Sequence, residues 1–159
     1  MLDYTLVSAK ATYRMPTPRD LPALLAMVQA FYRECQRQPG IPAEQVLATV
    51  RELGAHKDRG SVFVFESQGE PAGYAILIQC WSNELGGNVL VVDELFVDPR
   101  FRDKGIATDF LGLLRKVAPE GTRAIQVEAH RSHRRAQALY RRLGFCDTGR
   151  QVWSAAPDP

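Results

Sequence analysis

The N-terminal third of the chain places hydrophobic residues at helical spacing. Thr17 and Pro18 predict a helix start, because a hydroxyl can cap free N–H groups and proline fits the first helical turn. Pro39 and Gly40 predict the end of this helix, and Pro42 begins a second one. A short strand is predicted before both helices, over residues 10–15. The apolar positions that share a face in the two helices are Leu21, Leu24, Leu25, Val28, Phe31, Tyr32 and Cys35, then Val46, Leu47, Val50 and Leu53.

The middle of the chain changes to strand periodicity. Residues 61–66 and 72–80 are rich in β-branched and aromatic side chains, and the polar stretch between them predicts a hairpin. Gly86 and Gly87 predict a further turn. Residues 89–97 then form a nearly continuous apolar run, which is typical of a central strand buried on both faces.

Helical and strand periods alternate in the C-terminal third. Helical spacing returns over residues 105–118 and again over 133–143, and a strand is predicted between them at 123–129. A final strand or strand pair is predicted at 145–153. The resulting order β-α-α-β-β-β-α-β-α-β indicates an α/β fold with a mixed central sheet flanked by helices.

Length and composition indicate one domain over residues 1–159, with its core at about 10–153. The 159 residues are 45% hydrophobic, enough for a buried core. No run of about 18 apolar residues exists, and the first residues lack a signal-peptide pattern, so we expect a cytoplasmic protein without a membrane partner. The net charge of +2 does not favour nucleic acid. Three widely spaced cysteines indicate neither a disulfide framework nor a zinc site.

The stretch from Asp98 to Ala107 lies between the central strand and an amphipathic helix. Gly105 and Ala107 let the backbone approach a ligand, and a helix start presents free N–H groups. These amides and the helix dipole favour an anion, to which Arg102 and Lys104 add positive charge. A pyrophosphate fits this site. The alternative is an ordinary strand-to-helix turn with no ligand.

Two motifs resemble the acyl-CoA signature of the Gcn5-related N-acetyltransferase superfamily. The first is Arg102-x-x-Gly105-x-Ala107, preceded by the apolar residues 95–97. The second, residues 136–145, is similar to the family's A-x-x-L-Y-x-x-x-G-F helix. The motifs occur in the family's order and separation. The resemblance implies a mostly antiparallel sheet that splays where acetyl-CoA binds.

The resemblance also implies which residues hold acetyl-CoA, without a metal. It places an oxyanion at the backbone N–H of Phe96 or Val97. Asp103 stands where relatives often have Gly, and either caps the helix from outside the pocket or weakens cofactor binding. His133 stands where many relatives have Asn, and it is bulkier and can titrate. The cofactor-binding residues implied are Leu95, Phe96, Val97, Arg102, Asp103, Lys104, Gly105, Ile106, Ala107, Thr108, His133 and Ala136.

Acetyl transfer to an amine needs a base, a site for the oxyanion and an acid for the leaving thiolate. The resemblance places Tyr140 beside the CoA sulfur as the acid; the alternative is a tyrosine packed in the core. Asp93 and Glu94 are adjacent carboxylates in the apolar strand, and alternation sends them to opposite faces. Because an unpartnered buried carboxylate is costly, at least one should face a polar cleft or a cation. The pair is predicted to supply the base or to bind a cationic substrate; the alternative is a carboxylate held by a structural arginine.

The substrate prediction rests on Trp81–Gly87 and the acidic pair that follows, which are similar to the diamine and polyamine acetyltransferase branch. We therefore expect a small cationic amine as substrate. One alternative function is acetylation of a protein or peptide amine, and another is a non-catalytic acyl-CoA-binding regulatory domain. Assembly into a homodimer is a further possibility.

The remaining polar clusters predict no separate function. His130 and His133 lack a third ligand at useful spacing, so no metal site is expected. Five arginines cluster in the C-terminal part of the chain: Arg131, Arg134, Arg135, Arg141 and Arg142. We interpret them as a solvated helix face rather than an RNA-binding surface, and part of this face is a candidate contact for the CoA 3′-phosphate.

Overall fold

A six-stranded sheet runs through the computed structural model, which describes residues 5–35, 40–129 and 132–157. Neighbouring strands are antiparallel except for the last two, which are parallel because a helix carries the chain back between them. The mixed, mostly antiparallel sheet predicted from the sequence is therefore confirmed. The strands lie in chain order as β1 (Leu6–Val7), β2 (Thr12–Arg14), β3 (Gly60–Ser67), β4 (Glu70–Ser82), β5 (Gly87–Val97) and β6 (Thr122–Val127).

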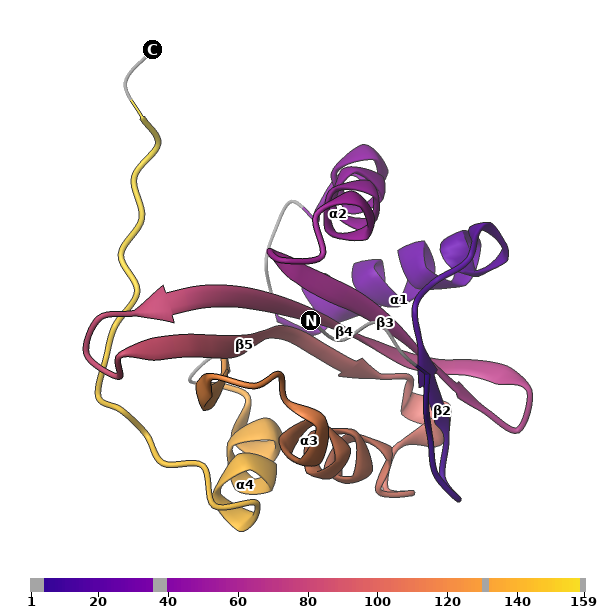
Figure 1. The fold of residues 1–159 in the computed structure, drawn as a ribbon. Helices are drawn as coiled ribbons and strands as arrows, with labels where there is room; N and C mark the ends of the chain where they lie inside the picture. Colours follow the sequence, from indigo (N-terminus) through magenta and orange to yellow (C-terminus); the bar gives the residue numbers. More distant parts are fainter. Residues whose placement is uncertain (1–4, 36–39, 130–131, 158–159) are drawn as a thin grey trace.

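Two pairs of helices cover the two faces of the sheet (Figure 1). Helices α1 (Leu21–Glu34) and α2 (Ala43–Ala55) lie on one face, and α3 (Ile106–Val117) and α4 (Arg134–Arg142) lie on the other. Short 3-10 turns, Pro18–Asp20 and Pro99–Phe101, precede α1 and follow β5. No helix in the described ranges has the length and apolarity needed to cross a membrane.

Strand alternation divides the apolar side chains into two cores. Beneath α3 and α4, the ring of Phe65 packs against Phe110 at 4.7 Å and against Tyr13 at 4.9 Å between ring centroids. Burying one such side chain contributes about 1.5–3 kcal/mol, so these contacts hold α3 firmly on the sheet. The core beneath α1 and α2 is formed by Leu24, Met27, Val28, Val46, Leu53, Val62, Tyr74, Ile76 and Phe96.

Strand β5 carries one residue more than β4 at the centre of their ladder. Ile76 pairs with Glu94 and the next residue of β4, Leu77, pairs with Val92, so Asp93 is the extra residue of a β-bulge. Val92 belongs to the core beneath α3, whereas Phe96 belongs to the core beneath α1 and α2. Regular alternation would send both residues to the same face. The bulge therefore reverses which side chains of β5 point to each face of the sheet in the last residues of the strand.

The strand predicted at residues 145–153 is wrong, because residues 143–157 contain neither helix nor strand. Gly149 has a left-handed φ of 69°, and its N–H donates to Asp147 Oδ1 at 2.9 Å, which closes a local turn and interrupts extension. Val152 and Trp153 are 84% and 86% exposed. Figure 1 shows this segment passing the turn between β4 and β5, where Arg150 pairs with Glu84, and then leaving the sheet.

Two smaller differences concern the N-terminal half. The strand predicted at 10–15 is the second arm of a hairpin, β1–β2, whose turn closes with Ser8 N–H donating to Ala11 O at 3.0 Å. The helix end predicted at Pro39 lies outside the described residues, and the observed α1 ends at Glu34.

A polar network joins the first strands to the start of α1. Both guanidinium nitrogens Nη1 and Nη2 of Arg14 donate to Asp20, at 2.8 and 2.9 Å, and Nη2 also donates to Glu66. The backbone N–H and hydroxyl of Thr17 donate to the same carboxylate. Because Arg14 donates to it, the pKa of Asp20 lies well below its usual value. This carboxylate fixes the angle at which the chain enters α1.

Replacing Asp20 should destabilise the fold in a pH-dependent way. Asp20→Asn leaves Arg14 without its bidentate partner and should lower the free energy of unfolding by about 2–4 kcal/mol at pH 7. Because the pKa of Asp20 is lower in the folded than in the unfolded protein, its ionised carboxylate stabilises the fold at pH values above the unfolded-state pKa, which is near 4. This stabilisation is lost as the pH falls toward the folded-state pKa. Urea unfolding from pH 7 to 3 should therefore narrow the difference between Asp20→Asn and wild type without closing it, because the folded-state pKa lies well below the usual value, whereas exposed Asp58→Asn should match wild type throughout. Equal midpoints for both mutants at pH 7 would show that the network contributes nothing.

Candidate functional site

Five consecutive backbone amides are free at the start of α3. Within the described residues, the N–H groups of residues 103–107 donate no hydrogen bond. Asp103 and Gly105 adopt left-handed φ angles of 63° and 79°, which curl the chain so that successive amides can converge. The first turn of α3 adds the positive end of its dipole, and Asp109 N–H donating to Gly105 O closes that turn. We call residues 103–107 the amide nest.

Asp103 has a positive φ, a conformation that glycine adopts at no steric cost, which agrees with the glycine that the resemblance implies at this position. Aspartate is among the few other residues that tolerate it. Its carboxylate lies 2.6 Å from Arg135 Nη2 at the start of α4, and both side chains are exposed. The carboxylate makes no cap to α3. Asp103 therefore connects the nest to α4.

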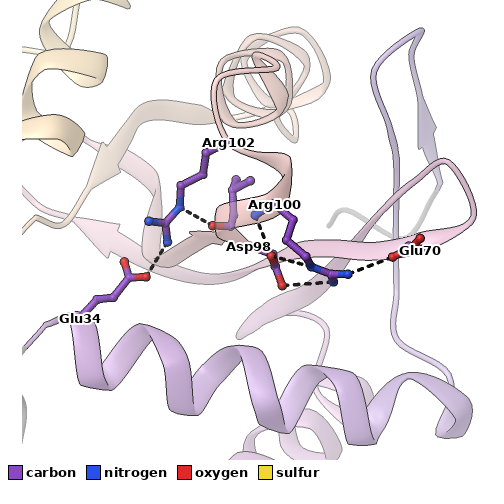
Figure 2. A network of polar contacts seen from close by, with 6 residues as sticks. Glu34, Glu70, Asp98, Arg100 and Arg102 are labelled. Carbon is purple, nitrogen blue, oxygen red and sulfur yellow. Dashed lines mark hydrogen bonds and ion pairs between the residues drawn. The ribbon is translucent and has the colours of Figure 1, made fainter.

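The cations predicted to face a ligand point elsewhere in this structure. Arg102 Nε donates to Val97 O at 2.8 Å and Nη2 donates to Glu34 Oε1 at 2.7 Å, as Figure 2 shows. Its guanidinium also lies over the ring of Phe96, 5.4 Å from the centroid. Lys104 Nζ lies 4.9 Å from the centroid of Phe101. In this arrangement, the free donors at the start of α3 are backbone amides rather than these side chains.

The turn between β5 and the nest is held by its own ion pairs. Asp98 Oδ1 accepts from the N–H of Arg100 at 2.9 Å and also from its guanidinium, which reaches Glu70 on β4 (Figure 2). These pairs are exposed and contribute little to stability. They define the path of the chain from the end of β5 to residue 102.

Strand β6 leaves β5 before the bulge. The parallel ladder ends with Val92 opposite Val127, and Glu128 N–H donates to Val92 O at 3.2 Å. Beyond this point β5 continues to Val97 and stays paired with β4. Beyond Val92 the edge of β5 is therefore not paired with β6, as expected for the predicted splay, and we call this unpaired edge of residues 93–97 the gap.

The ladder pattern decides which backbone groups face this gap. Asp98 N–H donates to Ala72 O on β4, at 2.9 Å. Because the facing of backbone groups alternates along an antiparallel ladder, Phe96 also presents its N–H and C=O to β4. Leu95 and Val97 present theirs to the gap, and the bond from Arg102 to Val97 O agrees with this. Of the two amides predicted for the oxyanion, the Val97 N–H is the one that faces the gap.

The predicted acid, Tyr140, is a buried tyrosine of α4. It is 8% exposed, and its ring meets the ring of Phe145 edge-on at 5.9 Å. Its hydroxyl has no hydrogen-bond partner among the described residues. In the described part of the chain, every side-chain oxygen or nitrogen that is fully buried has a partner. The Tyr140 hydroxyl oxygen is therefore not fully buried and keeps contact with solvent. Burial raises the pKa of Tyr140 to about 12. The phenol consequently carries its proton at neutral pH.

The two predicted carboxylates are separated by the bulge. Asp93 is exposed, whereas Glu94 is 8% exposed and faces the α1 side. Tyr32 of α1 donates to Glu94 Oε1 at 2.9 Å, and Tyr74 of β4 donates to Oε2 at 2.7 Å. Burial, followed by the charge of Glu94, raises the pKa of Tyr74 well above its usual value. Two of the partners of Glu94 are therefore phenols.

Sequence reasoning missed Tyr32 and Tyr74. Both sit in apolar stretches, where a tyrosine looks like one more core side chain. The available signal was Glu94 itself, because a buried carboxylate requires donors and a tyrosine hydroxyl is one of the few that fit an apolar surrounding.

The remaining predicted residues lie in the nest, in the core beside it or, for His133, close to the end of α1. Ile106 is buried, and Ala107 and Thr108 follow it in the first turn of α3. Leu95, Val97 and Ala136 pack against the core beneath α3 and α4. His133 precedes α4, with Nε2 at 3.3 Å from Glu34 O.

The polar clusters set aside in the sequence analysis are only partly visible. His130 and Arg131 lie outside the described residues. In the part of the chain that is described, no group of three or more His, Cys, Asp or Glu side chains is arranged to hold a metal ion.

Comparison with known proteins identifies the family. Residues 24–145 match the acetyltransferase (GNAT) family. An uncharacterized N-acetyltransferase of Methanocaldococcus jannaschii is 33% identical over 91 residues, which cover 56% of this chain but only 40% of that relative. An integron cassette protein from the mobile metagenome of Cole Harbour Salt Marsh is 28% identical, with a TM-score of 0.76 over 92% of this chain and 91% of that one.

A third similar protein has been solved with a ligand. The aminoglycoside N-acetyltransferase AAC(6′)-Iy, in complex with a bisubstrate analogue of CoA and acetylneamine, has a TM-score of 0.72 over 94% of this chain and 100% of that one. At 20% identity this likeness concerns the fold. Since the family match spans most of the chain and includes both motifs, this chain belongs to the acetyltransferase (GNAT) family.

Proposed function

We propose that this chain transfers an acetyl group from acetyl-CoA to a small cationic amine. The observation that carries the proposal is the amide nest, set directly beyond the gap between β5 and β6. Five free amides and a helix dipole suit a pyrophosphate. The unpaired edge of β5, which includes the N–H and C=O of Leu95, suits the amides of a pantetheine chain lying in the gap. When bound there, acetyl-CoA supplies the thioester.

Two groups of the protein would then act at the gap. The Val97 N–H donates to the thioester oxygen, because it faces the gap and is held by the β4 ladder. Tyr140 holds a proton on its hydroxyl for the departing sulfur. Its raised pKa keeps this proton in place at neutral pH. Burial in the core beneath α3 and α4 fixes the direction of the ring.

A cationic acceptor is supported by the carboxylates of β5. Glu94 places a negative charge on the α1 side of the sheet, and its two phenol donors stabilise the ionised form. We assign Glu94 to the distant ammonium of the acceptor. Exposed Asp93, one residue away on the bulge, is assigned to take the proton of the reacting amine, directly or through water. The similarity of residues 81–97 to the diamine and polyamine branch supports the same class of substrate.

Binding of the cofactor can be tested through stability. CoA at about 100 times its dissociation constant should raise the free energy of unfolding by roughly 2.7 kcal/mol. Gly105→Ala imposes a side chain on a left-handed residue, which costs about 1–2 kcal/mol and distorts the nest, so this variant should need roughly tenfold more CoA for the same melting shift. Gly112 lies in the same helix with open space around it, and Gly112→Ala should behave as wild type. A wild-type protein that millimolar CoA does not stabilise would disprove the cofactor assignment.

Tyr140→Phe separates catalysis from packing. The ring is kept, so CoA affinity should change little, while loss of a general acid should lower kcat by about one to four orders of magnitude. Because the wild-type phenol ionises only at about pH 12, its ionisation should not reduce activity below about pH 10. Wild-type turnover in the mutant would leave Tyr140 with a packing role alone.

Different kinetics are expected for the two carboxylates. Glu94→Gln should raise KM for a diamine at least about tenfold, with little effect on a monoamine with a neutral tail, because only the diamine presents a second ammonium. Asp93→Asn should lower kcat for both amines and shift the pH profile upward, since the amine must then lose its proton to solvent. Unchanged kinetics in both mutants would remove the acidic pair from the site. Faster acetylation of peptides than of diamines would refute the small-amine assignment.

A further inference from the structure

The N-terminal hairpin brings an unassigned lysine to the amide nest. Lys10 lies in the turn between β1 and β2, and its Nζ donates to the backbone carbonyl of Lys104 at 3.0 Å. A Cβ built on Gly105 would lie 2.9 Å from the same nitrogen. The ammonium therefore rests directly against the peptide that joins residues 104 and 105.

The geometry of this peptide gives the contact its meaning. A trans peptide is planar, and its C=O and N–H point in opposite directions. With the Lys104 carbonyl held by Lys10 on one side, the N–H of Gly105 must point to the other side. That N–H is one of the free amides of the nest. The contact with Lys10 thus sets the direction in which a central donor of the nest faces.

The backbone of Lys10 is itself fixed on two sides. Ser67 Oγ donates to Lys10 O at 2.9 Å, which ties the turn to β3. Ser8 Oγ accepts from Lys10 N–H and donates to Asp109 in the first turn of α3. The Tyr13 hydroxyl also lies 2.6 Å from Asp109 Oδ2. The hairpin and the start of α3 therefore form one connected unit, so Lys10 reaches the nest from a defined position.

We propose that Lys10 is a positioning residue for cofactor binding: by holding the Lys104 carbonyl it aims the Gly105 N–H at the pyrophosphate of CoA. This inference rests on the proposed function, because it assigns CoA to the nest. Lys10 lies behind the 104–105 peptide relative to that N–H, so it acts through the peptide and does not contact the phosphate. The side chain is exposed, so its role should appear in binding and not in stability.

The test is the affinity for CoA of Lys10→Met, titrated by calorimetry. Loss of a charge-assisted hydrogen bond should raise the CoA dissociation constant about tenfold. Lys10→Arg, which keeps the charge and the donors, should restore most of the affinity. Lys116→Met removes the same charge from the opposite end of α3 and should bind CoA as wild type. All variants should melt at nearly the wild-type temperature without ligand.

Two further measurements separate positioning from simple attraction and from damage to the fold. The loss of CoA affinity in Lys10→Met should persist in 0.5 M NaCl. At this salt concentration the screening length is about 4–5 Å, so long-range attraction between exposed charges is removed. Pantetheine, which lacks the pyrophosphate, should bind wild type and mutant equally in an NMR titration. Without ligand, the Gly105 amide resonance should move in Lys10→Met while that of Gly121, another left-handed glycine, stays in place.

The outcomes separate the two proposals. Equal CoA affinity in Lys10→Met and wild type, or a deficit that salt abolishes or that extends to pantetheine, would overturn the role of Lys10 and leave the proposed function intact. A wild-type protein that does not bind CoA would overturn the proposed function, and the role of Lys10 with it.

Discussion

The extra residue that Asp93 adds to β5 is the constraint on which the site depends. It turns Glu94 and Phe96 toward α1 and α2, although Leu90 and Val92 of the same strand pack beneath α3. It also lies just beyond Val92, where β6 leaves the ladder. On the other edge the ladder to β4 stays tight. A Cβ at Gly73 would lie 2.3 Å from Phe96 O, so glycine alone fits this close approach. One edge of β5 is thus held while the other is released.

The second fixed point is the start of α3. Residues 103–107 leave their amides free because Asp103 and Gly105 adopt left-handed conformations and because the first residues of a helix have no intrahelical acceptor for their N–H groups. Such a turn needs support from outside itself. The β1–β2 hairpin supplies this support through Ser8 and Tyr13 on Asp109, and α4 reaches the turn through Arg135. The aromatic packing of Phe110 on Phe65 then transmits the position of the sheet to the helix.

The sequence predicted most elements of the sheet and helices because their periods are clear. The run at 89–97 and the helical spacing at 105–118 lie within about two residues of the observed β5 and α3. The error at 145–153 has a local cause, since the Asp147–Gly149 turn overrides the β propensity of the residues around it. The bulge was not predictable from periodicity, because an extra residue in one strand is defined only by its partner strand. The resemblance indicated the nest, whereas the positions of Tyr32, Tyr74 and Lys10 depend on contacts between distant segments.

We propose that this chain binds acetyl-CoA at the amide nest and passes the acetyl group to an amine in the gap beside it. Release of free CoA thiol from acetyl-CoA, followed in time with and without a panel of amines, tests this most directly. We expect thiol release that requires an amine, is faster with diamines than with monoamines or peptides, and is matched by formation of the N-acetyl product. Binding of CoA without thiol release for any amine would contradict it and would indicate an acyl-CoA-binding domain without catalysis.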